Sequence, residues 1–331
     1  MNGTTFQRGL VSVILPTFNR PEFLREAVAQ VIAQTYRPLE LLLVNDGSTD
    51  ATGSVCDEIA ARHPDCVRVV HRENGGPGAA RESGRLIARG EFLQYFDSDD
   101  QIDPRKIEIQ VAALRGHPDC GIAYCKTREF TRGESPDDRC SQFTGEKLDR
   151  LFPRLLSGCC WPTITPLIRR SLSDAIGHWL PLRQEEDWEY DSRIAVAGVK
   201  LVWCDEFLAS AVNHPGPRAS GSGAQDPAKM RDRCTARLLL LNRALQAGVG
   251  ENTPDRRLFA NSLFLFSRQC GAAGLTEESR KMFAASLLAA GKVKLKNQTL
   301  YRLLTAMIGW GPAGTLCETL DKVRASARKN P

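Results

Sequence analysis

Short apolar runs that alternate with amphipathic segments set the pattern of the first hundred residues. Continuous apolar runs of strand length lie at residues 10–15, 39–44 and 67–70. Such runs are typical of strands that are buried on both faces of a parallel sheet. After the first run, Phe23, Ala27 and Val31 recur at helical spacing, and Asn19 is expected to cap that helix. Strands and helices in this alternation predict an α/β fold, a mostly parallel sheet flanked by helices.

Polar residues follow the predicted strands at the points where the strands end. They are Pro16 and Thr17 after the first run, Asp46 after the second, and Asp97, Ser98 and Asp99 after an aromatic-rich run at residues 91–96. Ligands of parallel sheets bind beyond the carboxyl ends of the strands. We therefore expect these side chains to line one site.

The segment at residues 97–100 contains three carboxylates. If the strand continues through it, Asp97 and Asp99 point to the same side. Two ionised carboxylates at such a short distance repel each other. Mg2+ or Mn2+ between them would remove this repulsion and would accept phosphate oxygens as further ligands. The alternative is an acidic turn in which Asp103 caps a helix that opens at Pro104.

A glycine-rich segment at residues 73–82 leads into another predicted helix. Its glycines indicate a loop that passes close to a ligand or to another stretch of backbone. The segment matches neither the dinucleotide-binding fingerprint nor the phosphate-binding P-loop. Arg81, one turn into the helix, either pairs with a phosphate or faces solvent, and we favour the first interpretation.

A second acidic cluster at residues 185–191 precedes a helix that ends at Gly198. Acids at the start of a helix are stabilised by its dipole, and this by itself accounts for Glu185, Glu186 and Asp187. The functional interpretation makes Asp187 a general base, which accepts the proton of a sugar hydroxyl as the new C–O bond forms. The dipole is expected to keep Asp187 ionised at neutral pH.

Three further parts of the chain bear on the substrate pocket. Residues 213–223 form either a mobile lid, in which His214 and Arg218 meet the leaving phosphates, or a plain linker. Residues 127–142 are predicted to be a long surface loop that contributes to acceptor recognition. Trp161 either lines the same pocket or packs in the core.

The chain changes character at residue 226, beyond which amphipathic helical segments dominate. The predicted organisation is a catalytic α/β domain over residues 1–225 and an all-helical appendage over residues 226–331. The basic residues of the appendage are Lys281, Lys292, Lys294, Lys296, Arg302, Arg324, Arg328 and Lys329. A solvated face and loose attachment to an anionic membrane surface both explain them.

Composition narrows the compartment and the partners. The chain is 42% hydrophobic and 25% charged, as in ordinary soluble domains, and no apolar run reaches the roughly 18 to 20 residues of a membrane span. The start lacks a signal-peptide pattern, and the eleven cysteines contain no Cys-x-x-Cys pair, so we expect reduced thiols in the cytoplasm. The net charge of +5 suits an anionic substrate or membrane surface, and no motif indicates nucleic-acid binding.

Together, these residues resemble the family 2 glycosyltransferases, which are inverting enzymes of the GT-A fold. The resemblance extends from about residue 11 to residue 197. It rests on residues 11–20, 34–36, 45–50, 74–77, Arg81, 89–91, 97–100, Glu186 and Asp187. In this order the set is specific for the family, but it says little about the sugar.

The resemblance implies a nucleotide-sugar site. Asp46 would bind the nucleotide base, and the other residues expected to bind the donor are Pro16, Thr17, Asn19, Arg81, Asp97 and Ser98. Two positions depart from the family pattern. Asn45 replaces a usual first Asp, and Glu82 follows Arg81 where Asn is common, which leaves the local role of Arg81 open.

The resemblance also implies the catalytic groups. Asp97 and Asp99 would form the Asp-x-Asp motif, with Asp99 as the principal ligand of a divalent cation, Mn2+ or Mg2+, and Asp97 nearer the ribose or the metal. Asp187 would be the catalytic base. Beyond residue 226 the resemblance implies nothing.

The predicted function is a glycosyltransferase that moves a sugar from a nucleotide-diphosphate donor, slightly favoured as a UDP-sugar, to a hydroxyl acceptor with inversion. A glycan or a lipid-linked saccharide is the expected acceptor, as in cell-surface polysaccharide biosynthesis. One alternative is a metal-dependent nucleotidyltransferase, which would attack phosphorus and need no base at Asp187. Another is a sugar-nucleotide-binding or glycan-binding subunit without catalytic activity.

Overall fold

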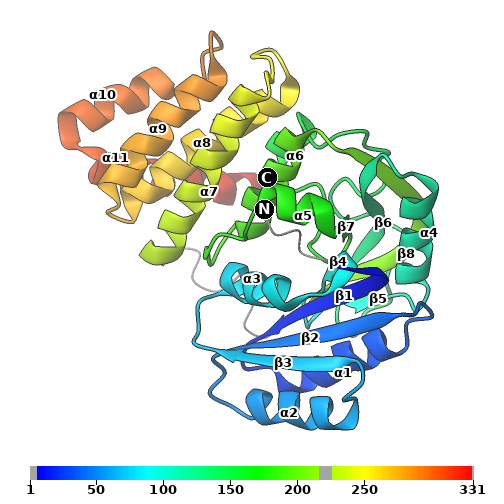
Figure 1. Cartoon of the computed structure of the whole chain (residues 1–331). Coiled ribbons are helices and arrows are strands. Elements are labelled where there is room, and N and C mark those ends of the chain that lie inside the picture. The colour runs from blue at the N-terminus through cyan, green and yellow to red at the C-terminus, as the bar shows by residue number, and fades with distance from the viewer. Residues whose placement is uncertain (1–5, 216–225, 330–331) are drawn as a thin grey trace. The chain divides into compact units, whose positions relative to one another are not determined.

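A computed structural model describes residues 6–215 and 226–329 of the 331-residue chain, with side chains described as far as residue 321. The described residues fall into two compact units (Figure 1). The first comprises Met1–Leu151 with Cys159–Pro217, and the second comprises Phe152–Gly158 with Arg218–Pro331. The short segment Phe152–Gly158 thus groups with the helices of the second unit, although it lies within the stretch that the sequence pattern assigns to the catalytic domain.

The first unit is built on a mixed sheet whose eight described strands have the order β3-β2-β1-β4-β7-β6-β8-β5. The strands are β1 (Gln7–Thr17), β2 (Leu39–Asp46), β3 (Val67–Arg72), β4 (Gly90–Tyr95), β5 (Gln101–Ile102), β6 (Cys120–Thr131), β7 (Leu167–Arg169) and β8 (Lys200–Asn213). β1 pairs in parallel with β2 and β4, and β2 with β3, so four carboxyl ends share one edge. β7 is antiparallel to β4 and β6. The predicted α/β class is confirmed, with an antiparallel strand in the middle of the sheet.

Helices cover both faces of this sheet. They are α1 (Pro21–Ile32), α2 (Thr52–Arg62), α3 (Pro77–Ile87), α4 (Lys106–Gly116), α5 (Arg170–Ile176) and α6 (Glu186–Ala197). Figure 1 shows α1 and α2 on one face of the parallel strands and α3 on the other. Two covered faces explain why these strands are continuously apolar in sequence.

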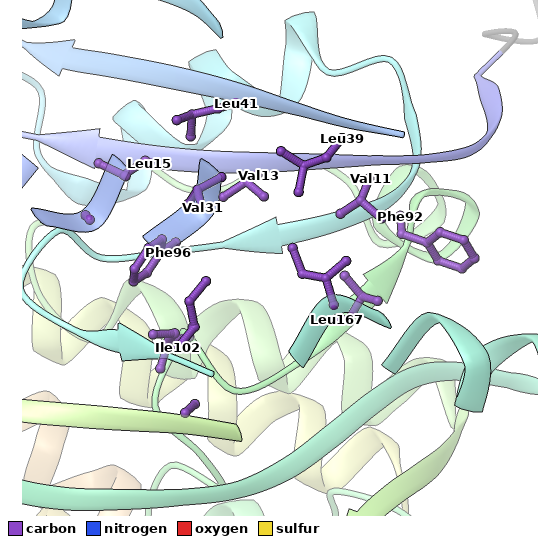
Figure 2. Packing of buried hydrophobic residues seen from close by; sticks show 14 of the residues in the cluster. Val11, Val13, Leu15, Val31, Leu39, Leu41, Phe92, Phe96, Ile102 and Leu167 are labelled. Carbon is purple, nitrogen blue, oxygen red and sulfur yellow. The ribbon is translucent and has the colours of Figure 1, made fainter. Parts of the chain in front are cut away.

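The core of the first unit alternates along β1. Val11, Val13 and Leu15 are fully buried and join the hydrophobic cluster drawn in Figure 2, which also contains Phe92 of β4. Ile14 points to the opposite face and packs against α3. A Cβ added at Gly84 of α3 would lie 2.4 Å from Ile14 Cγ2, so glycine is needed there for the helix to approach the sheet.

Two expectations about element boundaries are wrong. Arg20, not Asn19, occupies the cap position of α1, and it makes no side-chain cap. Asn19 has a positive φ of 51° and uses its side chain elsewhere, as described below. The predicted surface loop at residues 127–142 begins later, because β6 extends to Thr131 through its pairing with β8.

The second unit is all-helical, as predicted. It contains the short helix η1 (Arg154–Ser157) and the helices α7 (Pro227–Gln246), α8 (Pro254–Ala272), α9 (Thr276–Ala290), α10 (Gln298–Ile308) and α11 (Trp310–Lys329). Its core includes Phe259 and Leu263 of α8 and Met282 of α9, which are fully buried. Across the described residues, none of the helices combines the length and the apolar character that crossing a membrane requires.

Candidate active site at the carboxyl edge of the sheet

Asp46, the last residue of β2, is buried, and hydrogen-bond donors enclose its carboxylate. Oδ1 accepts from the backbone N–H of Gly75 at 3.0 Å, and Oδ2 accepts from that of Gly76 at 2.8 Å. Arg72 forms an ion pair with the same carboxylate. Asn74 Nδ2 donates to the Asp46 carbonyl at 2.9 Å. The carboxylate therefore holds the loop after β3 against the end of β2.

The turn after β1 is tied to the turn after β2. Asn19 Oδ1 accepts from the backbone N–H of Thr49 at 2.8 Å, and the backbone N–H of Asn19 donates to Ser48 Oγ at 3.0 Å. Pro16 is half-buried and Thr17 is buried. The Thr17 hydroxyl has no hydrogen-bond partner in the described structure, and a buried polar group without a partner is available to a ligand.

Arg81 of α3 lies between two acidic segments that are far apart in the sequence. Its Nη2 donates to the two oxygens of Asp97 at 2.8 and 3.1 Å, and its Nη1 donates to Glu186 Oε1 at 2.6 Å. The guanidinium also lies 5.0 Å from the centre of the Trp179 ring. Burial alone would lower the pKa of Arg81, but the charges of Asp97 and Glu186 outweigh it and raise that pKa. In this structure Arg81 pairs with carboxylates, whereas the sequence favours a phosphate as its partner.

Asp99 has a different set of partners. Its Oδ2 lies 2.8 Å from Arg20 Nη1 and 3.0 Å from His214 Nε2. Burial tends to raise the pKa of Asp99, but the charge of Arg20 and the hydrogen bond from His214 outweigh it and lower that pKa. His214 follows the end of β8, and its ring centre lies 4.7 Å from that of Phe23. Arg218, the other predicted lid residue, lies outside the described residues.

The expectation that Asp97 and Asp99 point to one side of an extended strand is wrong. β4 ends at Tyr95, and the backbone N–H of Asp100 donates to the Asp97 carbonyl at 3.2 Å, which closes a turn. Ser98 is buried within this turn. The turn sends Asp97 towards Arg81 and Asp99 towards Arg20. Asp103 Oδ1 accepts from the backbone N–H of Arg105 at 2.8 Å, directly ahead of α4, which begins at Lys106 and not at Pro104.

Asp187 lies in the first turn of α6, beside Glu186. Burial raises the pKa of Asp187, and the charge of Arg81 only partly compensates. Burial also raises the pKa of Glu186 to about 7, against the opposing charge of Arg81. One turn further along, burial and the neighbouring Asp187 raise the pKa of Asp191 well above its usual range. Burial, and not the helix dipole, therefore decides the direction in which the pKa of Asp187 moves.

Backbone strain marks both turns of the site. Asn19 and Glu185 have positive φ angles of 51° and 56°, and they are two of the four non-glycine residues in the described chain with this conformation. Such residues persist where the surrounding structure holds them, and they are common in functional sites. Glu185 precedes α6 directly and so fixes the direction in which the acidic helix start leaves the preceding loop.

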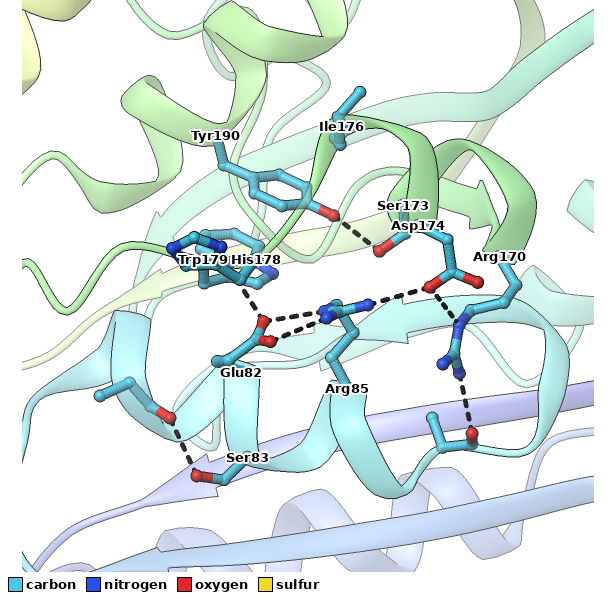
Figure 3. Close-up of polar contacts among 12 residues, drawn as sticks. Glu82, Ser83, Arg85, Arg170, Ser173, Asp174, Ile176, His178, Trp179 and Tyr190 are labelled. Carbon is cyan, nitrogen blue, oxygen red and sulfur yellow. Dashed lines mark hydrogen bonds and ion pairs between the residues drawn. The ribbon is translucent and has the colours of Figure 1, made fainter. Parts of the chain in front are cut away.

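A network beneath the site explains why Glu82 follows Arg81. Glu82 accepts two hydrogen bonds from Arg85, both of 2.8 Å, and one from the backbone N–H of Trp179 at 3.0 Å (Figure 3). Arg85 continues to Asp174 at 2.9 Å. Glu82 thus attaches the Trp179 segment to α3. Trp179 in turn stacks on Tyr190 of α6 at 3.9 Å between ring centres.

Several members of this site carry little or no signal in the sequence. Trp179, Tyr190 and Tyr95 form an aromatic cluster beside Arg81. The position of Tyr190 could have been found from the sequence, since it lies four residues after Glu186 and therefore one turn along the same predicted helix. Trp179 is a single aromatic residue in a loop and carried no such signal. Trp161, predicted either to line the pocket or to pack in the core, is buried and lies 5.4 Å from the Tyr124 ring.

The acids of the turn after β4 suit an open metal site. Among the described residues, no group of three or more His, Cys, Asp or Glu side chains is arranged to hold an ion by itself. Mg2+ is commonly held by one or two carboxylates together with substrate phosphates. Asp99 and the partly exposed Asp97 have the oxygen chemistry for that arrangement. These residue types suit a cation whose remaining ligands come from a diphosphate, and such a cation would share Asp97 with Arg81 and Asp99 with Arg20 and His214.

Comparison with known proteins identifies the sequence relatives of this chain. The family model described as glycosyl transferase family 2 matches residues 12–177. An uncharacterized glycosyltransferase of Rickettsia typhi is 36% identical over 162 residues, which are 45% of this chain and 48% of the relative. The putative glycosyltransferase EpsH of Bacillus subtilis is 31% identical over 180 residues, which are 53% of this chain and 51% of EpsH. The chain thus spans about half the length of these curated relatives.

Solved structures share the fold at low sequence identity. Staphylococcus aureus TarS in complex with UDP aligns with a TM-score of 0.66 and 20% identity, over 97% of this chain and 92% of that one. A mannosyltransferase from Pyrobaculum calidifontis, in complex with GDP-Man and Mn2+, aligns with a TM-score of 0.51 and 20% identity, over 97% of this chain and 86% of that one. At this identity the likeness concerns the fold.

Proposed function

This chain belongs to glycosyl transferase family 2, and from that membership and the geometry of the site we propose that it transfers a sugar from a nucleotide-diphosphate sugar to a hydroxyl acceptor, with inversion at the anomeric carbon. The observation that carries the proposal is the position of Arg81, whose guanidinium bonds Asp97 and Glu186 at once. This contact joins the acidic turn after β4 to the start of α6, where Asp187 lies. Donor and acceptor groups can thereby act on one reacting centre.

The donor end of the site would be formed by the turns after β1 and β2. Asp46 would bind the nucleotide base, directly or through the loop that it holds, with Pro16, Thr17, Asn19 and Ser98 around the nucleotide. A UDP-sugar is the favoured donor, since TarS has been solved in complex with UDP-GlcNAc. Arg81, already bonded to Asp97, would hold that carboxylate towards the ribose or the metal.

The leaving-group end would be formed around Asp99. Asp99, together with Asp97, would hold Mn2+ or Mg2+, which when bound supplies Lewis-acid stabilisation of the departing diphosphate. Arg20 lies beside Asp99, and its positive charge would also be available to phosphate oxygens. His214, which bonds Asp99, would lie beside the leaving diphosphate.

Asp187 would act on the acceptor. Its carboxylate would accept the hydroxyl proton while the acceptor oxygen forms the new bond to the anomeric carbon and the bond to the diphosphate breaks. A single displacement of this kind inverts the anomeric configuration and needs no covalent intermediate. The raised pKa of Asp187 makes it a stronger base than an ordinary carboxylate.

The acceptor would be a glycan or a lipid-linked saccharide, and the reaction would belong to cell-surface polysaccharide biosynthesis. We place the enzyme in the cytoplasm, with peripheral attachment to the inner face of the membrane. The absence of an apolar helix of spanning length from the described residues is compatible with attachment from one side.

The test is a donor screen by thermal shift, with and without Mn2+, followed by assignment of the product anomer by NMR. A true donor raises the melting temperature by mass action, and Mn2+ should enlarge the shift in the wild type but not in Asp99→Ala. Asp119→Asn is the matched control, because Asp119 is exposed and pairs with Lys200 at 2.9 Å. A product that retains the donor's anomeric configuration, or release of pyrophosphate, would contradict the proposal.

A further inference from the structure

One apolar side of α10 faces solvent and not the core of the second unit. Leu300, Leu303 and Met307 are 58%, 57% and 79% exposed, and Ile308 is exposed as well. Their spacing of three, four and one residues places them on one side of a helix. Large apolar side chains that gather on one exposed face commonly mark a contact surface.

The orientation of α10 is fixed by its other side. Tyr301 is buried, with its ring centre 5.4 Å from that of Phe264, 5.8 Å from that of Phe283 and 6.0 Å from that of Trp310. Thr305, one turn along, is buried too. These contacts hold the helix, so Leu300, Leu303 and Met307 remain outward in the folded unit.

The sequence around α10 is basic and contains no acid. Residues 291–317 include Lys292, Lys294, Lys296 and Arg302, all exposed, and neither Asp nor Glu. By contrast, Lys281 on α9 pairs with Glu277 at 2.6 Å. The sequence that leads into the exposed apolar face is thus basic, and the carboxylate of Glu251 lies beside Gly291 at the start of this stretch.

We propose that this surface, defined by Leu300, Leu303, Met307, Ile308 and the three lysines 292, 294 and 296, docks on an anionic lipid bilayer. An apolar helix face with flanking basic residues is the chemistry that lies in a membrane interface, and anionic headgroups attract basic residues next to it. A second copy of the chain, meeting this surface with its own, would bring like charges together. This inference rests on the proposed function, since it names the surface that would bring the enzyme to a lipid-linked acceptor.

The experiment is co-sedimentation of the full chain with vesicles of pure phosphatidylcholine and with vesicles that contain phosphatidylglycerol. Binding to the anionic vesicles only is expected. The triple variant Leu300→Ser, Leu303→Ser, Met307→Ser should lose binding roughly tenfold or more, because it removes the inserted apolar area. Replacing Lys292, Lys294 and Lys296 with Gln should cost about fivefold for each lysine, with the loss reduced at high salt.

Leu86→Ser is the matched control, because Leu86 is exposed on α3 of the first unit and should leave vesicle binding unchanged. Sedimentation velocity without vesicles tests self-association. One outcome would overturn the proposal in favour of a second copy of the chain. In it, the wild type self-associates and does not bind vesicles, and the triple variant no longer self-associates. Vesicle binding needs no turnover, so it is judged separately from the donor screen. If donor raises the melting temperature of the wild type but the wild type does not bind anionic vesicles, only this inference is refuted and the proposed function stands.

Discussion

The site contains buried carboxylates at the end of β2 and at the start of α6, and the two segments differ in how many hydrogen-bond donors and positive charges surround their carboxylates. Asp46 is surrounded by two backbone N–H groups and Arg72. At the start of α6, Glu186, Asp187 and Asp191 crowd together, and Arg81 bonds Glu186 alone among the three. Burial raises the pKa of each of these three acids.

The difference shows what each carboxylate can do. A carboxylate whose oxygens are occupied by fixed donors shapes a loop. Carboxylates that are buried together with too little positive charge bind protons more tightly, which brings them towards the range where a general base works. The first segment is suited to holding a binding pocket and the second to moving a proton.

The largest effect is expected from removing the proposed base. Asp187→Asn keeps the size of the side chain but cannot accept the acceptor proton, so the transfer rate should fall by roughly 10² to 10⁴. Donor affinity, measured by thermal shift or calorimetry, should change little. Asp119→Asn serves again as the exposed control. If the Asp187 variant transferred sugar at a rate close to that of the wild type, Asp187 would not be the general base.

Removing Arg81 should affect stability most. Arg81→Met leaves Asp97 and Glu186 without their shared partner, and the free energy of unfolding should fall by about 3 kcal/mol, the lower end of the range for a broken buried pair because Asp97 is partly exposed. Urea denaturation measures the change. Arg25→Met is the control, since its pair with Glu58 is exposed and should matter little. Equal midpoints for both variants would show that the bridge between the two acidic segments is not needed for the fold.

A smaller loss is expected at the other segment. Asp46→Ala leaves the N–H groups of Gly75 and Gly76 and the Arg72 guanidinium without their acceptor, at a cost of about 1–3 kcal/mol. The same denaturation series measures it, and limited proteolysis reports whether the loop after β3 opens. If Asp46→Ala unfolded at the wild-type urea concentration while losing donor affinity, Asp46 would serve the ligand rather than the loop.

The smallest effect is a pH dependence that separates the two segments. The pKa of Glu186 is raised from 4.5 to about 7, so its protonated form favours the folded state. That contribution is complete below about pH 4.5 and is lost as the pH rises through 7. Glu186→Gln should therefore gain stability relative to the wild type between pH 5 and 8, as measured by melting temperature. Parallel profiles would mean that Glu186 is ionised throughout and simply pairs with Arg81.

Much of this arrangement was predictable because it depends on local pattern. Continuous apolar runs indicate strands covered on both faces, and the polar residues after them indicate the edge where a ligand binds. The helical nature of the second unit followed from its 3.6-residue periodicity. The acidic turn after β4 was recognisable by composition, but its backbone was not. The alternating acids at residues 97–99 suggest the extended end of a strand, whereas the backbone closes a turn between Asp97 and Asp100.

What the sequence determined by itself is therefore the order of strands and helices and the residue types that stand at the edge of the sheet, since both depend on neighbours in the chain. Only the tertiary structure decided that Arg81 joins Asp97 to Glu186, 105 residues from the arginine, that Glu82 holds Trp179, and that Asn19 turns to Thr49 instead of capping α1. The physical reason is that charge pairing and burial act through space. A carboxylate's partners and its proton affinity depend on which distant segments the fold brings within a few ångströms.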